Sequence, residues 1–473
     1  MTHGHLNADL DPLRLEDFNE DGVAEKFSKV HPFRKLIDIE FYGFTEADLD
    51  KEFYVDLPHW GGLLAQKKNW TLREIKEALE RAYCNKIGVE YMHIPSREHC
   101  NWIREQIELK QFNPLSKQEK LLLLDRLYWT DEFAQFIATK FNTMKRFGLE
   151  GCDAFIPGMK VAMDACVEYG AEKAVIGMPH RGRLNMLANV VRKPLPQLFA
   201  EFVGTVPLED KEANWSTNTG DAKYHLGTSY TRTYPGGKEL TVEVLANPSH
   251  LECINPVVMG RVRAKNHIWK QSVEDDFGAD RKKVIPFLIH GDAAFSGQGV
   301  VYESIQMQDL KNYTVGGTIH VIVNNQIGFT TVPSKGRSGM YCSDLAKAIN
   351  APIFHVNANS MEDVHHAFKM AAEYRQQFGH DVVIDLIGYR KYGHNELDQP
   401  SFTQPLMYKQ VAKMEPVARI YERELLESGD TDEAQILRMK TKIQNALEAA
   451  YQESKSYQFK AEDWVTKEWD DIK

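Results

Sequence analysis

The stretch VIPFLIHGDAAFSGQGVVYESIQMQDLKNYTVGGTIHVIVNNQIGF, residues 284–329, decides the fold of this chain. Two apolar, β-branched runs, at 284–290 and 318–323, flank a segment with helical spacing. Strands joined by a crossover helix run parallel, so this order predicts a strand–helix–strand unit. Asp292 and Asn325 each follow one of the two runs. We therefore expect these two side chains at the same end of two parallel strands.

The residue types at this strand end predict a site for a hard divalent cation. A carboxylate, an amide oxygen and a nearby backbone carbonyl are ligands that Mg²⁺ accepts, with phosphate oxygens and water completing an octahedron. The alternative is structural: Asp292 would cap a helix, and Asn324 and Asn325 would form a turn. The pairing of Gly-Asp with Asn-Asn about thirty residues later favours the metal site.

The same alternation of short apolar runs and helical segments extends in both directions from this unit. Further runs that predict strands lie at 174–177, 240–245, 353–356 and 382–387. Segments with helical spacing lie at 156–168, 183–191, 256–265, 299–310 and 361–378. This order predicts an α/β fold, a doubly wound and mostly parallel sheet, whose ligand lies beyond the carboxyl ends of the strands.

The two ends of the chain have a different pattern. Residues 1–145 are mostly helical and polar, with one long helix expected over 70–91. From about residue 404 the pattern is helical and charged, with helices expected at 414–426 and 433–457. We predict three parts: a helical N-terminal module (1–145), an α/β domain (146–403) and a helical connector (404–473). Neither helical part carries a chemical motif of its own.

Composition narrows the class of protein. The chain has 473 residues, 43% of them hydrophobic and 26% charged, with a formal net charge of −10. These values indicate a globular protein of more than one domain and argue against nucleic acid as the main partner. The sequence contains no run of about 18 apolar residues, so it predicts no membrane-spanning helix. Six cysteines without CxxC spacing argue against a structural zinc site and favour a reducing compartment.

The N-terminus lacks the apolar stretch of a secretory signal and the Arg- and Ser-rich pattern of a transit peptide. We expect either that the protein stays where it is made or that a leader is missing from this chain.

Three other segments follow predicted strands or lie close to them. GMPHRGRLN (177–185) contains His180, Arg181 and Arg183 near a helix start, where two cations indicate an anionic ligand. ANPSHLE (246–252) contains Ser249, which alone would be read as a helix cap. KYHLGTS (223–229) contains His225, which alone would be read as a surface histidine. Their common placement favours a single site.

Several ordered motifs carry a family resemblance. They are KRFGLEG (145–151), GMPHRGRLN, KYHLG, ANPSHLE, HGDAAFSGQG (290–299), VNNQIGFTT (323–331), APIFHVNA (351–358), GHNE (393–396) and FTQPLMYK (402–409). Together they closely resemble the thiamine diphosphate-dependent, decarboxylating component of 2-oxoglutarate dehydrogenase. The resemblance runs from about Leu10 to Lys455. The neighbouring 2-oxoadipate dehydrogenase family shares several of these motifs.

The resemblance implies a role for particular residues. It implies that Asp292, Asn325 and the carbonyl of Ile327 hold Mg²⁺. It implies a cofactor site lined by Arg181, Ser249, Leu251, Asp292, Ala293, Ala294, Asn325 and Ile327. It implies that His180 and His225 are active-site histidines, and that Phe147, Ser229 and Ser249 contribute to the substrate pocket.

The resemblance also implies an activity and partners. The activity is oxidative decarboxylation of 2-oxoglutarate with succinyl transfer to a lipoyl group, in the tricarboxylic acid cycle. The implied partners are the lipoyl-bearing succinyltransferase component and a second copy of the chain. The implied location is the mitochondrial matrix, or the cytoplasm for a bacterial source. A 2-oxoadipate dehydrogenase and a non-catalytic scaffold remain as alternatives.

Relatives of this type continue into a second α/β module, which binds the aminopyrimidine of the cofactor and supplies the activating glutamate. By resemblance, this chain is the diphosphate-binding half, and we expect it to be inactive alone. The stretches 207–220 and 266–282 have the character of expanded surface loops.

Overall fold

An eight-stranded sheet forms the centre of the computed structural model, which describes all residues except 16–35, 58, 111–112, 204–224, 269–280 and 459–473. In spatial order the strands are β3 (Ile87–Glu90), β9 (Ile353–Asn357), β10 (Val382–Ile387), β8 (Ile319–Asn324), β7 (Val284–Gly291), β4 (Lys173–Gly177), β6 (Glu239–Val244) and β5 (Thr228–Thr233). The six inner strands are parallel, and β3 and β5 pair antiparallel at the two edges. The doubly wound, mostly parallel α/β fold is confirmed, as are all six predicted strands.

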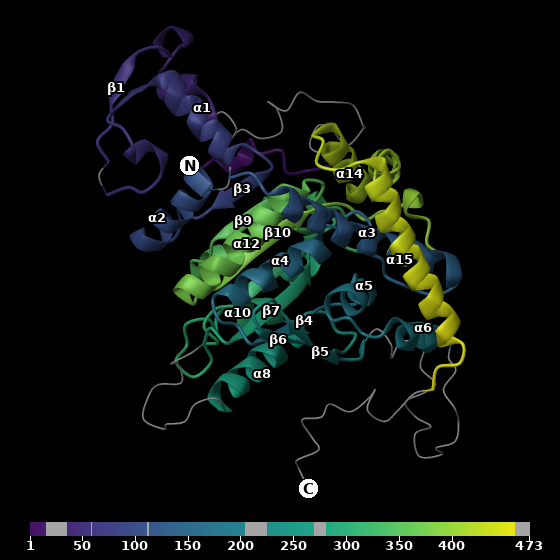
Figure 1. The fold of residues 1–473 in the computed structure, drawn as a ribbon. Helices are drawn as coiled ribbons and strands as arrows, with labels where there is room; N and C mark the ends of the chain where they lie inside the picture. The colour runs from purple at the N-terminus through teal and green to yellow at the C-terminus, as the bar shows by residue number, and fades with distance from the viewer. Residues whose placement is uncertain (16–35, 58, 111–112, 204–224, 269–280, 459–473) are drawn as a thin grey trace.

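Helices cover both faces of the sheet (Figure 1). On one face α12 (Met361–Phe378) packs over β9 and β10, and α4 (Phe155–Glu168) packs against α12. On the other face α8 (Ile254–Ile268) packs on β4 and β7. Alternate residues of β8 face opposite sides of the sheet. Val321 lies in the main core with α4 and α12, whereas Ile322 packs with α9 and α10. The sheet is therefore the middle layer of three.

The remaining described helices have the following bounds: α1 (Leu72–Tyr83), α2 (Arg97–Glu105), α3 (Lys117–Lys140), α5 (Arg183–Asn185), α6 (Leu195–Val203), α9 (Asp292–Gly297), α10 (Gly299–Ile305), α11 (Pro333–Gly336), α13 (Pro405–Val411), α14 (Val417–Glu427) and α15 (Glu433–Ser454). Five-residue π-helical turns follow α2 and α5. Short 3₁₀ helices lie at Gly4–Leu6, Ile39–Tyr42, Glu46–Asp48, Leu63–Ala65, Asp344–Ile349 and Pro400–Phe402. Strands β1 (Glu52–Tyr54) and β2 (Asn69–Thr71) form a separate two-stranded sheet.

The N-terminal part differs from the expectation of a single helix over 70–91. That prediction is right for α1, whose start is fixed by a reciprocal cap between Thr71 and Glu74. It is wrong beyond Tyr83, because the chain turns and β3 joins the central sheet beside β9. Ile87 and Val89 are almost fully buried there. This segment forms a strand because it pairs with a strand more than 260 residues away. The spacing of apolar residues within the segment gives no information about such a partner.

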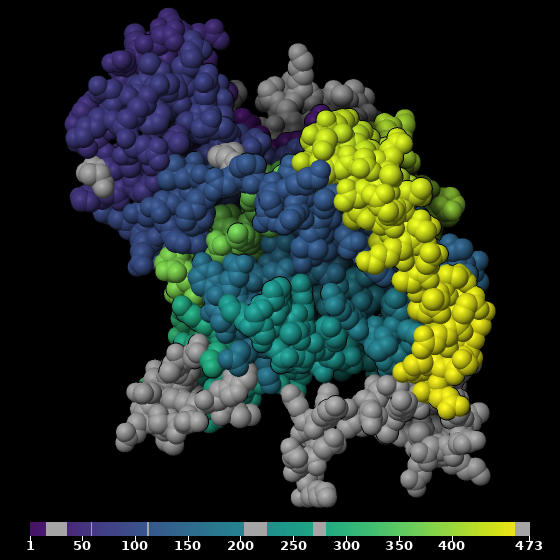
Figure 2. Space-filling model, viewed as in Figure 1, coloured from purple at the N-terminus to yellow at the C-terminus, as the bar shows by residue number. Residues whose placement is uncertain are grey.

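The C-terminal helices expected at 414–426 and 433–457 are confirmed as α14 and α15, with small shifts of their ends. Both pack against α3, and α15 also packs against α6. Figure 2 shows α15 running along one side of the molecule, with the N-terminal residues forming a lobe at the opposite side. Ile443 and Leu447 of α15 belong to the main core. The three-part division at 145 and 403 stays a prediction.

The stretch 207–220 and most of 266–282 lie outside the described residues. Within the described part of the chain, every helix is too short or too polar to cross a bilayer.

Candidate active site

Asp292 and Asn325 lie at one end of the central strands, as the sequence predicts. Gly291, the last residue of β7, is in register with Val323 near the end of β8. Asp292 then opens α9, while Asn325 begins the loop after β8. The two segments are in close contact, because a Cβ on Gly328 would lie 2.6 Å from the Cβ of Ala293. A larger residue at position 328 would therefore push the two loops apart.

The Asp292 carboxylate is buried, and it forms a long ion pair with Arg337. It is 3% exposed, and the Arg337 guanidinium approaches it only to 3.8 Å. Burial raises the pKa of Asp292 to about 6, although Arg337 opposes this shift. A divalent cation would compensate such a charge. Among the described residues no three His, Cys, Asp or Glu side chains gather to hold a metal. A cation here would use one carboxylate with amide and carbonyl oxygens, a donor set that fits Mg²⁺.

The loop after β8 is tightly ordered by its own side chains. Asn324 Oδ1 accepts a hydrogen bond from the backbone of Gln326 at 3.1 Å, and Asn325 Oδ1 accepts one from Ile327 at 3.3 Å. Gln326 has a left-handed backbone with φ of 59°. Asn324 Nδ2 also donates to Asp385 Oδ1 at 2.9 Å, which ties the loop to β10. The Ile327 side chain is buried.

A second cluster, of aromatic and imidazole rings, lies beyond the end of β4. The His180 ring is 4.3 Å from the Phe147 ring and 5.7 Å from the His394 ring, measured between centroids. Phe329, in the loop after β8, packs edge-on against His394 at 4.9 Å. The rings therefore connect the β4 segment to the loop that contains Asn325. Burial, with a smaller effect of the Arg181 charge, lowers the pKa of His180 to about 4, so its imidazole is neutral near pH 7.

Arg181 and Glu396 hold this cluster together from opposite sides. The Arg181 guanidinium donates to the carbonyl oxygens of Gly148 at 3.0 Å and His394 at 2.8 Å. The Glu396 carboxylate accepts from the backbone of Arg146 at 3.1 Å and of Gly148 at 2.8 Å. Phe147 sits between these contacts with a left-handed φ of 46°. The motif GHNE thus contributes two side chains, His394 and Glu396, to which the sequence analysis assigned no role.

Arg183 does not behave as the sequence predicts. Its side chain is fully buried, and it donates to the carbonyls of Leu226 at 2.8 Å, Leu245 at 2.7 Å and Met178 at 3.3 Å. The guanidinium therefore joins three loops rather than facing an anion. Its helix, α5, is a single turn that continues as a π-helix. The expected helix over 183–191 is present, but it is not α-helical throughout.

The remaining predicted site residues lie on loops and at the edge of the sheet. His225 is half-buried, and its carbonyl accepts from the backbone of Asn247 at 3.1 Å. The Asn247 side chain donates to the Met178 carbonyl at 3.0 Å, which links the His225 backbone to the segment that contains His180. Ser249, Leu251 and Ala293 are exposed, whereas Ala294 is buried. Ser229 is exposed on edge strand β5, opposite Glu243.

The sequence analysis missed a buried chain of polar groups behind the 246–252 loop. Glu252 adopts a left-handed φ of 69°, and its carboxylate lies 2.6 Å from His290 Nδ1. His290 Nε2 lies 3.0 Å from His320 Nδ1, and His320 Nε2 lies 3.3 Å from Asp381. These contacts hold the loop that contains Ser249 against His290 of β7, which lies two residues before Asp292. The adjacency of His290 to the Gly-Asp motif was the only signal in the sequence.

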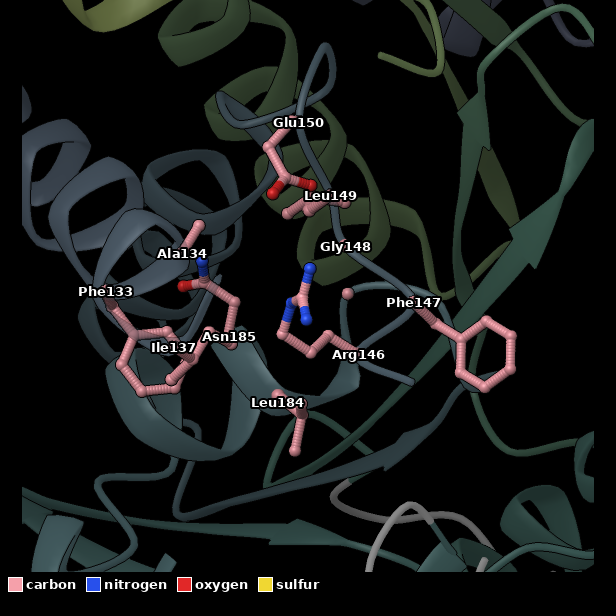
Figure 3. Close-up of a pocket in the computed structure, with 11 residues that line it drawn as sticks. Phe133, Ala134, Ile137, Arg146, Phe147, Gly148, Leu149, Glu150, Leu184 and Asn185 are labelled. Atoms are coloured by element: carbon pink, nitrogen blue, oxygen red, sulfur yellow. The ribbon is translucent and has the colours of Figure 1, made fainter. Parts of the chain in front are cut away.

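Two cavities adjoin the segment Arg146–Asp153, and neither suits a 2-oxo acid. The first, drawn in Figure 3, holds about 20 Å³, room for roughly one water molecule. Figure 3 shows the Phe147 ring directed away from the Arg146 guanidinium in this cavity. The second holds about 340 Å³ but is lined by three acidic residues, Asp131, Glu150 and Asp153, against one lysine, Lys391. Burial and its acidic neighbours raise the pKa of Asp153 to about 8, and an anionic ligand would meet the same repulsion.

The fold is a thiamine diphosphate-binding α/β fold, and comparison with known proteins gives the family of the chain. Residues 126–462 match the dehydrogenase E1 component family, and the chain belongs to that family. It is 46% identical to the "2-oxoglutarate dehydrogenase, mitochondrial" of Dictyostelium discoideum, across the whole chain. It is 45% identical to the protein of the same name from Saccharomyces cerevisiae, again across the whole chain. It is 43% identical to a "2-oxoglutarate dehydrogenase-like, mitochondrial" protein of Pongo abelii, over 99% of the chain.

The chain spans less than half the length of these curated relatives. It covers 44% of the Dictyostelium protein, and 45% of the yeast and the Pongo proteins. The resemblance to the 2-oxoglutarate dehydrogenase family that the sequence motifs indicate is confirmed over this length.

Proposed function

We propose that this chain is the diphosphate-binding half of a thiamine diphosphate-dependent 2-oxoglutarate dehydrogenase. The complete enzyme would decarboxylate 2-oxoglutarate oxidatively and transfer the succinyl group to a lipoyl group. The E1 dehydrogenase family is thiamine diphosphate-dependent, which supports the cofactor. The names of the Dictyostelium and Saccharomyces relatives support the substrate.

The observation that carries this proposal is the placement of Asp292 and the Asn325–Ile327 loop at the ends of neighbouring strands β7 and β8. We assign the Asp292 carboxylate, the Asn325 amide oxygen and the Ile327 carbonyl as ligands of Mg²⁺. The carboxylate is buried and its ion pair with Arg337 is long, at 3.8 Å, which gives an electrostatic reason for a cation at this position. The backbone at Ala293 and Ala294, at the start of α9, would face the diphosphate. Arg181, Ser249 and Leu251 would complete that side of the site.

When bound, thiamine diphosphate supplies the carbon nucleophile and accepts the electrons released by decarboxylation. The chain's own residues would bind and orient the substrate. We assign His180 and His225 to the 2-oxo oxygen and to proton transfer. The His180 imidazole, which is neutral near pH 7, can both donate and accept a hydrogen bond. Phe147, Ser229 and Ser249 would shape the pocket around the substrate chain.

Partners and location follow from the same relatives. A decarboxylase that transfers a succinyl group requires a lipoyl-bearing acceptor, so we propose the succinyltransferase component of a 2-oxoglutarate dehydrogenase complex as partner. We also propose a homodimer. The relatives named above are called mitochondrial, which supports the mitochondrial matrix for a eukaryotic source.

Cofactor binding and substrate turnover test this proposal. Calorimetry on the full-length protein should detect thiamine diphosphate binding with Mg²⁺ and lose it with a chelator. Carbon dioxide release, with ferricyanide as electron acceptor, should be faster from 2-oxoglutarate than from 2-oxoadipate. Faster release from 2-oxoadipate would assign the chain to the neighbouring activity. Absence of metal-dependent cofactor binding would support a scaffold role instead.

A further inference from the structure

The loop Asn324–Ile327 adopts a backbone that needs support from outside. Gln326 has a φ of 59°, a region that residues other than glycine enter only when their surroundings hold them there. The Asn324 and Asn325 side chains satisfy the backbone N–H groups of Gln326 and Ile327. These two bonds do not fix the orientation of the Gln326 side chain, which depends on other contacts.

The N-terminal segment supplies that contact. Gln326 Nε2 donates to Asp11 Oδ1 at 2.6 Å and to the carbonyl of Gly388 at 2.9 Å. Asp11 and Gln326 are 315 positions apart in the chain. This hydrogen bond to a carboxylate is short and charge-assisted, a stronger class than a bond between neutral groups.

Asp11 is itself held in one orientation. Its Oδ1 also accepts from the backbone of Leu13 at 2.9 Å, and its Oδ2 accepts from that of Leu15 at 2.6 Å. Leu13 is buried in the same apolar cluster as Ile327. Two consecutive residues of the loop, Gln326 and Ile327, are therefore held by Asp11 and by the cluster that includes Leu13.

The segment around Asp11 is anchored on the sheet rather than on the loop alone. Asn357, at the end of β9, donates to the carbonyl of Asp9 at 3.0 Å, and the backbone of Asp9 donates to Asn85 at 2.9 Å. Ala8 and Leu10 pack against Ile387 at the end of β10. The segment thus links the ends of β9 and β10 to the loop after β8.

We propose that Asp11 is a positioning residue, through which the N-terminal segment Gly4–Leu15 sets the metal-binding conformation of the loop Asn324–Ile327. The proposal rests on the proposed function, because it takes Asn325 and Ile327 as metal ligands. Asp11 itself would not touch the metal, the cofactor or the substrate.

The test compares Asp11→Ala with Gln326→Ala, which removes the same hydrogen bond from the other side, in the full-length protein. Asp9→Ala is the matched control, because the Asp9 side chain is exposed on the same segment. Mn²⁺ affinity is measured by electron paramagnetic resonance. Hydrogen exchange of a peptide covering residues 319–330 is measured in the metal-free protein, and thermal unfolding shows whether each variant is folded.

We expect both test variants to lose about 10–100-fold in Mn²⁺ affinity, the range seen when groups behind a metal ligand are removed. The double variant should lose less than the sum of the two single losses in free energy, because the two changes share the contact between Asp11 and Gln326. Both should exchange faster in 319–330 than the wild type and Asp9→Ala. A folded Asp11→Ala or Gln326→Ala with wild-type affinity and exchange would overturn the proposal.

The two proposals fail in different ways. Absence of Mn²⁺ binding in the wild type would contradict the metal site, while the hydrogen-exchange comparison would still test the contact. Wild-type binding that is unaffected in both test variants would leave the metal site intact and remove Asp11 from its support.

Discussion

Asp292 shows how one residue can indicate a ligand. A buried carboxylate is costly unless a charge compensates it, and Arg337 stays 3.8 Å from this one, beyond hydrogen-bonding distance. An asparagine of the same shape would be cheaper to bury if the role were structural. The presence of the acid therefore favours a function that needs its charge.

The substitution Asp292→Asn separates these two roles. We expect Mg²⁺-dependent thiamine diphosphate affinity to fall at least about 10–100-fold, because a metal ligand loses its charge. Thermal unfolding of the metal-free variant should occur at the wild-type temperature or above, because a buried charge is removed. Calorimetry and thermal unfolding check the two outcomes. Asp309→Asn, a change at an exposed carboxylate, is the control. Unchanged cofactor affinity in Asp292→Asn would contradict the assignment.

His225 permits a test of proton transfer separate from cofactor binding. Replacement by alanine should lower kcat about 10²–10⁴-fold, the usual contribution of a positioned acid or base, while thiamine diphosphate affinity stays within a few-fold. Steady-state kinetics and calorimetry on the full-length protein measure the two quantities. The matched change is His59→Ala, at an exposed histidine of the N-terminal part. Full turnover in His225→Ala would return this residue to the role of a surface histidine.

At the scale of elements, buried charges cross the sheet between β10, β9 and β3. His355 Nδ1 lies 2.8 Å from Asp385, and its Nε2 lies 3.0 Å from Glu90. Burial disfavours the charged imidazole, but the two carboxylates outweigh it and raise the pKa of His355 to about 9. Lys347, 2.7 Å from Glu90, and His5, at 3.6 Å, face the same group. The edge strand β3 is therefore joined to the parallel strands by ion pairs as well as by the ladder.

These ion pairs predict a pH dependence of stability. The pKa of His355 is raised above its ordinary value of 6.5, so its contribution is complete below pH 6.5 and is lost as the pH rises through about 9. His355→Gln should cost about 3–5 kcal/mol of unfolding free energy near pH 6, because each of two buried carboxylates loses its partner in an ion pair with His355. It should also flatten the decline between pH 6.5 and 9.

Urea unfolding at pH 6, 7.5 and 9 measures this effect. His380→Gln is the control, since that partly exposed histidine faces the largely exposed Asp309 at 3.6 Å. Wild type and His355→Gln with parallel stability profiles across this range would show that His355 does not titrate as described.

At the scale of the whole molecule, the chain carries the proposed diphosphate loops at the carboxyl ends of its central strands and spans less than half of its relatives. Family resemblance puts the aminopyrimidine site and its activating carboxylate on a second α/β module. A site shared between two modules loses its orientation and its shield from water when one is absent.

We therefore expect a protein consisting of residues 1–473 to be folded and to release no carbon dioxide from 2-oxoglutarate with Mg²⁺ and thiamine diphosphate. Addition of the second module should restore release. The assay is carbon dioxide evolution, with circular dichroism to establish folding and Asp292→Asn in the restored protein as the negative control. Activity of residues 1–473 alone at the level of the complete enzyme would contradict a divided site.

The sequence by itself determined the fold class, the six parallel strands, the C-terminal helices and the positions of Asp292 and Asn325 after neighbouring strands. Each of these rests on local order: apolar runs, helical spacing and the residue that follows a strand. Each of these patterns lies within about ten to forty consecutive residues, so it can be recognised directly in the sequence.

Only the tertiary structure decided the rest. It assigned Ile87–Glu90 to the sheet, turned the Arg183 guanidinium onto three carbonyls, and brought Asp11 to Gln326. In each case a polar or apolar group finds its partner across tens to hundreds of residues. Which partner it finds depends on how the helices and strands pack, because buried hydrogen-bonding groups take whatever partner the fold places beside them. The spacing of residues along the chain therefore does not predict which partner such a group contacts.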